Sequence, residues 1–177
     1  MRMRVALLAL ATLISTTVPL ISTPVAMRAQ EKRDYLSDTE ADKIREATTP
    51  SAKMILFVTF ADDRILKLKY SLAHPSTDRR RAEQLNALIN AYTGCIDDAA
   101  DVIEVARERQ QDIKLGLKQL TTRGKEHLAY LQELQKSGAE LDSYKETLDD
   151  AVEATQDALN DAEKAGKEIS APVRRKQ

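Results

Sequence analysis

The chain has 177 residues, with 27 basic and 28 acidic side chains and a formal net charge of −1. Charge that is nearly balanced and spread along the chain argues against nucleic-acid binding, which requires a concentrated basic surface. Cys95 is the one cysteine in the sequence, so a disulfide framework is excluded.

Residues 1–29 have the layout of a secretory signal peptide. Arg2 and Arg4 precede an apolar run over residues 5–21, Ala29 stands at a plausible cleavage point, and the segment has no acidic residue. Cleavage after Ala29 would leave about 148 residues, which suits one domain. Three of the 27 basic residues leave with the signal, so the mature chain keeps 24 against 28 acidic ones. We therefore expect a slightly acidic periplasmic or secreted protein.

The same segment could instead remain attached as a membrane anchor. Spanning a bilayer takes about 20 consecutive apolar residues. The run over residues 5–21 is shorter and contains threonines, a serine and Pro19. We favour cleavage, and we expect membrane contact only if the signal is retained.

Two capping patterns open the predicted domain. Ser37 and Glu40 form a Ser-x-x-Glu capping box, which predicts a helix over about residues 38–47. Thr49 followed by Pro50 predicts the start of a second helix over about residues 50–73. Its apolar run at residues 54–60 could also form a strand, but the spacing of apolar residues favours a helix.

A heptad seam dominates the rest of the sequence. Alternating steps of three and four from Ala82 to Ile169 meet apolar residues at most positions, which predicts long helices in a coiled coil or bundle. Ser137-Gly138 is the preferred turn between helices of about 78–136 and 140–168. Gly116 or Gly124 could add a kink, whereas Gln110 reads as a tolerated polar position.

These elements predict one all-α domain over residues 30–171, followed by a disordered basic tail at 172–177. Unbroken, a helix over 78–136 would be about 88 Å long. The helices then form either an elongated coiled-coil-like array or, if the long helix breaks, a compact antiparallel four-helix bundle. We slightly favour the elongated array.

No catalytic constellation is recognisable. The sequence has no CxxCH, HExxH, GxSxG or glycine-rich phosphate motif. His127 falls on the seam, where we interpret it as a packed spacer. Asp97, Asp101, Glu104 and Glu108 share a helix face turned away from the seam, and we expect that face to be solvated. We predict no catalytic, metal-binding or cofactor-binding residues and no cofactor.

Two features are candidate contacts. Arg79, Arg80 and Arg81 stand in the first turn of the long helix, where positive charge is mildly unfavourable. They could bind an anionic partner or form a solvated charge run. Cys95 could form an intermolecular disulfide, or be a small apolar residue beside the seam, or carry a reactive thiol.

The segment over residues 31–42, EKRDYLSDTEAD, follows directly on the signal. It resembles the opening of a group of secreted bacterial α-helical proteins of unknown function. The resemblance implies a bacterial envelope protein and transfers no functional residue.

We therefore expect a non-enzymatic structural or protein-interaction role, as a scaffold, adaptor or chaperone-like protein. We expect an unidentified protein as the partner. The heptad seam could also pair copies of the chain into a homo-oligomer. The alternative is a membrane-associated helical protein, held by an uncleaved signal or by the basic tail.

Overall fold

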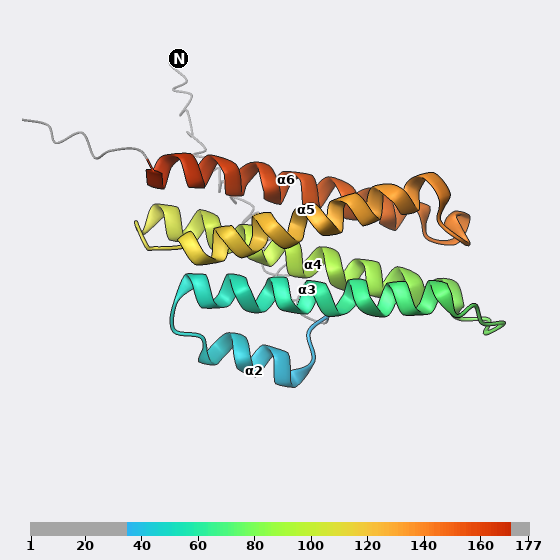
Figure 1. The fold of residues 1–177 in the computed structure, drawn as a ribbon. Helices are drawn as coiled ribbons and strands as arrows, with labels where there is room; N and C mark the ends of the chain where they lie inside the picture. Colours follow the sequence, from blue (N-terminus) through green and yellow to red (C-terminus); the bar gives the residue numbers. More distant parts are fainter. Residues whose placement is uncertain (1–34, 171–177) are drawn as a thin grey trace, which may run out of the picture.

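The computed structural model describes residues 35–170, and within this range the chain forms helices and no strand. The elements are α2 (Asp38–Glu46), α3 (Pro50–Ala73), α4 (Arg81–Glu108), α5 (Lys114–Ser137), the short 3-10 helix η1 (Leu141–Ser143) and α6 (Lys145–Ser170) (Figure 1). The predicted all-α class is confirmed. The predicted signal peptide at 1–29 and the basic tail at 172–177 lie outside the described residues.

The first two helices begin where their capping residues predict. At α2, the Ser37 side chain accepts a hydrogen bond from the Glu40 amide, and the Glu40 carboxylate accepts one from the Ser37 amide at 2.9 Å. At α3, Thr49 Oγ1 accepts from the Ala52 amide at 3.1 Å, with Pro50 in the first position. Each cap satisfies amides that have no partner inside the helix.

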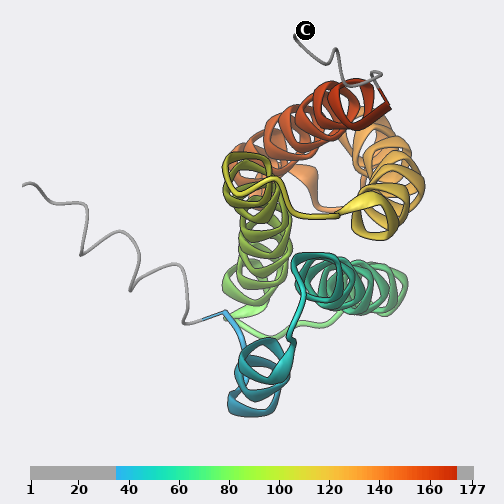
Figure 2. The same ribbon diagram turned by 90° about the vertical axis from the view of Figure 1, so that its left-hand side faces the viewer.

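The four long helices form a bundle with a diagonal connection. α3 packs against α4 and α5, and α6 packs against the same two helices. Viewed along the bundle, the chain crosses from α4 to α5 between opposite corners (Figure 2). The result is two antiparallel hairpins, α3–α4 and α5–α6, that lie side by side with α3 parallel to α5.

The sequence left open whether the helix over residues 78–136 is continuous, kinked or broken, and the structure shows that it is broken. The chain breaks at residues 109–113, so the favoured elongated array gives way to the compact bundle. The alternative kinks at Gly116 and Gly124 are wrong, because both residues lie inside α5. Gly116 instead allows close packing, since a Cβ there would come within 2.8 Å of the Met54 sulfur.

A Schellman motif ends α4, and Gln110 occupies its left-handed position. Gln110 has a φ of 53°. Its amide donates to the Arg107 carbonyl at 3.1 Å, and the next amide, of Gln111, donates to the Ala106 carbonyl at 2.9 Å. Glycine usually occupies this position because it has no Cβ to clash. Because a glutamine occupies this position, the sequence lacks the glycine that usually indicates the end of a helix.

The turn at Ser137-Gly138 is confirmed, because α5 ends at Ser137 with Gly138 as its cap. The last helix begins later than the predicted residue 140. Glu140 adopts a φ of 58° and the 3-10 helix η1 follows, so α6 starts at Lys145. The hydroxyl of the buried Tyr144 donates to the Ala139 carbonyl at 2.7 Å and holds this connection together.

The predicted seam is the core of the bundle. Its first member, Ala82, is exposed, and the neighbouring Arg81 is buried in its place. Most of the other apolar members are buried: Leu85, Ile89, Tyr92, Ile96, Ala99, Ile103, Ala106, Ile113, Leu117, Leu120, Leu131, Leu134, Leu148, Leu159 and Ala162. Because the bundle folds back on itself, the seam is covered within a single chain.

Candidate binding site

A buried ion pair attaches α2 to the bundle. The two terminal nitrogens of Arg64, on α3, lie 2.6 and 2.7 Å from the carboxylate oxygens of Glu40, and the Arg64 side chain is only 9% exposed. The same guanidinium donates to Asp63 at 2.8 Å and to the Tyr35 carbonyl at 3.2 Å. Hydrogen bonding from Arg64 lowers the pKa of Glu40 to about 2, against the opposing effect of burial. Both partners therefore stay charged at neutral pH.

Tyr35 forms a second attachment, just before α2. Its hydroxyl lies 2.5 Å from Asp98 Oδ2 and 2.9 Å from the Gly94 carbonyl oxygen, both on α4. Burial, together with Asp98, raises the pKa of the Tyr35 hydroxyl, which stays protonated as a donor. The Tyr35 ring packs directly on Gly94, where a Cβ would come within 2.6 Å of the ring.

A cavity of about 650 Å³ lies between α2, the first turns of α3 and the end of α4. Leu36 and Ile44 line it from the side of α2, and no residue of α2 itself is buried. Figures 1 and 2 show α2 lying outside the four-helix bundle, beside α3. The volume falls within the range of about 300–1,000 Å³ that is typical of small-molecule sites.

The cavity wall changes character along α4. Asp98 and Asp101 line the end near Tyr35, Val102 and Val105 line the middle, and Arg109 lines the far end. At a rise of 1.5 Å per residue, Asp98 and Arg109 are about 16 Å apart along the axis of α4. One end of the cavity is acidic, the middle is apolar and the other end is cationic.

α3 supplies an apolar and a basic residue on the facing wall. Phe57 lines the apolar part, and Lys53, one turn nearer the start of α3, lies toward the end of α4 that carries Arg109, because the two helices are antiparallel. Neither Lys53 nor Arg109 takes part in an ion pair within the described part of the chain. Arg45 also lines the cavity but pairs at the surface with Asp42 at 2.6 Å. Two basic side chains without an ion-pair partner in the described residues therefore line one end of the cavity.

The chain matches no protein-family model, no curated protein and no solved structure. No helix within residues 35–170 is long and apolar enough to span a membrane. The same residues hold no group of three or more histidine, cysteine, aspartate or glutamate side chains placed to bind a metal ion. The cavity beneath α2 is the candidate site that the geometry offers.

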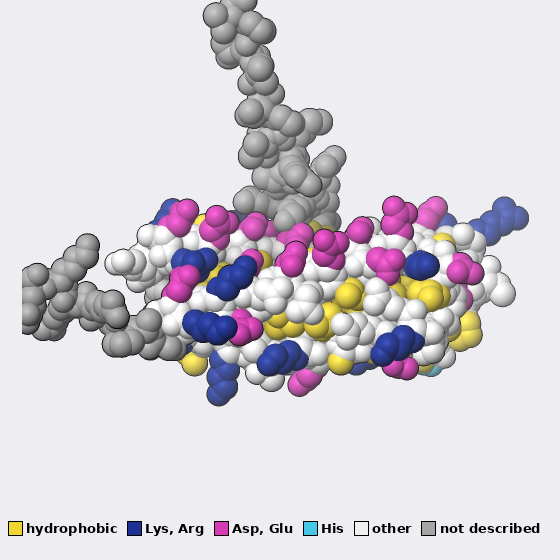
Figure 3. Space-filling view, turned by 90° about the horizontal axis from the view of Figure 1, so that it is seen from above, with side chains coloured by type: hydrophobic (Ala, Val, Ile, Leu, Met, Phe, Trp, Pro, Cys, Tyr) yellow, Lys and Arg dark blue, Asp and Glu magenta, His cyan; other side chains and the backbone are white. Residues whose placement is uncertain are grey.

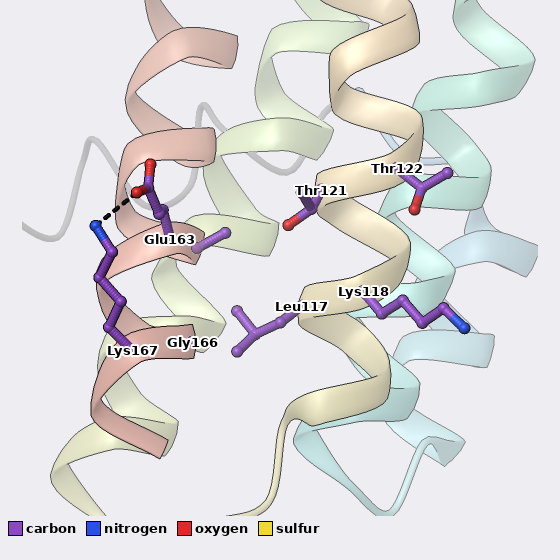
Figure 4. A pocket seen from close by; sticks show the side chains of 8 residues that line it. Leu117, Lys118, Thr121, Thr122, Glu163, Gly166 and Lys167 are labelled. Atoms are coloured by element: carbon purple, nitrogen blue, oxygen red, sulfur yellow. Dashed lines mark ion pairs between the residues drawn. The ribbon is translucent and has the colours of Figure 1, made fainter. Parts of the chain in front are cut away.

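A second depression, of about 450 Å³, lies between α5 and α6. Figure 4 shows Leu117 and Thr121 turned toward α6 and Lys118 turned away. Lys167 pairs with Glu163 at 2.6 Å, so that cation already has a partner. This depression lies away from α2, and its lining does not change from acidic through apolar to cationic as that of the cavity does.

Acidic side chains gather along one edge of the molecule when it is viewed from the side of α6 (Figure 3). The predicted solvated face of α4 is confirmed for Asp101, Glu104 and Glu108, which are exposed, while Asp97 is half-buried. Asp101 also lines the cavity beneath α2.

The structure separates the arginine cluster that was a candidate contact. Arg79 and Arg80 are exposed. Arg81 is buried, and its Nε lies 2.9 and 2.7 Å from the two carboxylate oxygens of Glu140. Its Nη2 donates to the Ser71 carbonyl at 2.8 Å. The prediction is corrected for Arg81, because an internal carboxylate and a helix-end carbonyl already occupy this guanidinium.

Cys95 is fully buried in the core. Burial raises the pKa of its thiol to about 12, so the reactive thiolate is suppressed at neutral pH. The candidate intermolecular disulfide is corrected, because a second chain cannot reach this sulfur while the bundle is folded. The structure favours a small apolar residue beside the seam.

His127 is packed in the seam, as the sequence predicts. It is 3% exposed, its Nε2 lies 2.6 Å from Asp62 Oδ1, and its ring meets the Tyr92 ring edge-on at 5.5 Å. Arg123 also donates to Asp62, at 3.0 Å. Burial lowers the pKa of His127, although Asp62 opposes the change. This cluster joins α3 to α5 inside the bundle.

Sequence reasoning missed the residues that build the cavity and hold α2. The sequence identified Glu40 only as part of the capping box, and Tyr35 only as part of the segment that carries the resemblance. Arg64 leaves no distinct signal, because it follows Asp62 and Asp63 in a run of three charged residues. Its carboxylate partner lies 24 residues earlier, which no local pattern identifies.

Proposed function

We propose that the chain is an exported, non-enzymatic helical protein that acts by binding, as a scaffold, adaptor or chaperone-like protein of the bacterial envelope. The contact site in this proposal is the cavity beneath α2. The observation that supports the proposal is the cavity itself. Its middle is apolar, and Lys53 and Arg109, which form no ion pair within the described residues, line one end. The signal-like residues 1–29 support export.

Site-specific photo-crosslinking in the native cell envelope tests this role. A photoreactive residue at Ile44, which lines the cavity, should yield one crosslinked species that mass spectrometry identifies. Leu115, which is 69% exposed on α5, serves as the control position. Equal products at both positions, or none at Ile44, would contradict a binding role for the cavity.

The second candidate is a membrane-associated helical protein, held by an uncleaved signal or by the basic tail at 172–177. It depends on the apolar run over residues 5–21, which is shorter than the about 20 residues that span a bilayer. Intact-mass analysis of the exported protein separates the two candidates. A mass that begins at Gln30 supports cleavage, whereas a mass that includes residues 1–29 supports retention.

A further inference from the structure

We propose that the cavity beneath α2 binds a single-chain amphiphile with an anionic head group, an inference that rests on the binding role proposed above. The inference rests on the residues that line the cavity. Lys53 and Arg109 line one end, and Phe57, Val102 and Val105 line the middle. A molecule with one anionic end and one apolar chain matches the cationic end and the apolar middle. A molecule that is polar throughout would leave the apolar wall in contact with water.

The head group belongs at the Arg109 end. Lys53 and Arg109 form no ion pair within residues 35–170, so both can donate charge-assisted hydrogen bonds to a carboxylate or a phosphate. The opposite end repels an anion because Asp98 and Asp101 line it. The apolar chain would then lie against Phe57, Val102 and Val105, beneath α2.

The cavity has the size of a small-molecule site. Its volume of about 650 Å³ lies within the range of about 300–1,000 Å³ for such sites. Leu36, Ala41 and Ile44 line it from the side of α2, so a single alkyl chain would lie between α2 and the bundle.

The test is a fluorescence titration of the full chain with dansyl-undecanoic acid, followed by displacement with unlabelled dodecyl compounds below their micelle concentrations. We expect saturable binding of one probe per chain. Dodecanoate and dodecyl phosphate should both displace the probe, and the stronger competitor indicates whether a fatty acid or a phosphate headgroup is the better ligand. Dodecylamine should displace it at least roughly tenfold more weakly, because its head group is repelled by Lys53 and Arg109.

Two variants locate the site. The double substitution Lys53→Met and Arg109→Met should weaken dodecanoate binding by roughly tenfold or more, while dodecanol binding stays unchanged. Val105→Trp should block the cavity, and it should preserve the fold because Val105 is 44% exposed. The matched control is Lys118→Met with Lys167→Met, at the depression between α5 and α6, which should bind like the wild type.

Four results would overturn the inference: no saturable binding, equal displacement by dodecylamine, wild-type affinity in the Lys53/Arg109 double variant, or a concentration-dependent dimer that excludes the probe. The last result would show that a second copy of the chain, and not an amphiphile, fills the cavity beneath α2. A specific crosslink at Ile44 without dodecanoate binding would overturn the ligand class alone and leave the proposed binding role in place.

Discussion

At the scale of single residues, two buried arginines hold together segments that are distant in sequence. Arg64 joins α3 to the start of α2, and Arg81 joins the start of α4 to the α5–α6 connection through Glu140. A guanidinium suits both positions because its planar fork binds a carboxylate through two nitrogens and still has donors for backbone carbonyls. Lysine, with its compact ammonium group, could not replace either one.

The substitution Glu40→Gln should lower the free energy of unfolding by about 2 kcal/mol, because it removes charged hydrogen bonds from the buried Arg64. Urea unfolding of the full chain measures this change. The control Asp42→Asn removes a carboxylate whose pair with Arg45 is exposed, with 55% and 71% of the two side chains accessible. That variant should unfold nearly like the wild type. Equal effects of the two substitutions would contradict a structural role for the Arg64–Glu40 pair.

Stability should also fall as the pH drops below about 6.5, the ordinary pKa of histidine. In the folded chain, burial lowers the pKa of His127. The unfolded chain therefore binds a proton at a pH where the folded chain still resists it, and folding becomes less favourable. Urea unfolding between pH 7.5 and 5.5 measures the slope.

The two histidines of the chain provide a matched comparison. His127→Gln should flatten the pH dependence between 7.5 and 5.5, whereas His74→Gln should keep it, because His74 is exposed at the end of α3. An unchanged slope in His127→Gln would show that another group causes the pH dependence.

At the scale of elements, the break between α4 and α5 decides the architecture. Residues 109–113 turn the chain back across the diagonal of the bundle, which lets the α5–α6 hairpin cover the α3–α4 hairpin. Without this turn, α4 and α5 would form one straight helix, and the α5–α6 hairpin could not fold back onto the α3–α4 hairpin.

Replacing Gln110 by glycine should therefore stabilise the fold by about 1 kcal/mol. Gln110 has a φ of 53°, a conformation that costs a residue with a Cβ and costs glycine little. Thermal and urea unfolding measure the gain. Gln111→Gly is the control, because Gln111 has no positive φ, and it should give no gain. A loss of stability in Gln110→Gly would contradict the Schellman geometry.

The substitution Gly94→Ala should detach the Tyr35 anchor of α2. The added Cβ would come within 2.6 Å of the Tyr35 ring, and such overpacking costs about 1–3 kcal/mol unless the ring moves away. Hydrogen exchange should become faster in α2 and stay unchanged in α5 and α6. Gly166→Ala is the control, because a Cβ there meets nothing within 4 Å. Unchanged exchange in α2 would show that Tyr35 does not hold it.

At the scale of the whole molecule, the bundle covers its own seam, and this bears on self-association. The apolar residues that would pair two copies of a coiled coil are packed between α3, α4, α5 and α6 of one chain. Cys95 is part of the same core.

Light scattering should therefore give the mass of one chain, without dependence on concentration. The Cys95 thiol should react with an aromatic disulfide reagent only after the protein is unfolded, because it is fully buried. Rapid labelling of the native protein, or a disulfide-linked dimer on a non-reducing gel, would contradict the closed bundle.

The sequence alone determined the features that depend on neighbouring residues. The Ser37–Glu40 capping box and the Thr49-Pro50 start predicted where α2 and α3 begin, because each cap acts within one helical turn. The period of the seam predicted the helical class and most of the buried positions after Ala82, because burial of one helix face imposes that period on the sequence.

Only the tertiary structure decided what depends on residues that meet from distant parts of the chain. The turn at Gln110 left no compositional signal, since its left-handed position holds a glutamine where a glycine is usual. The partners of Arg64 and Arg81, the burial of Cys95 and the cavity beneath α2 all arise from how the helices pack. Packing decides which arginines find an internal partner: Arg81 is buried against Glu140, whereas Arg109 is exposed and forms no ion pair within residues 35–170.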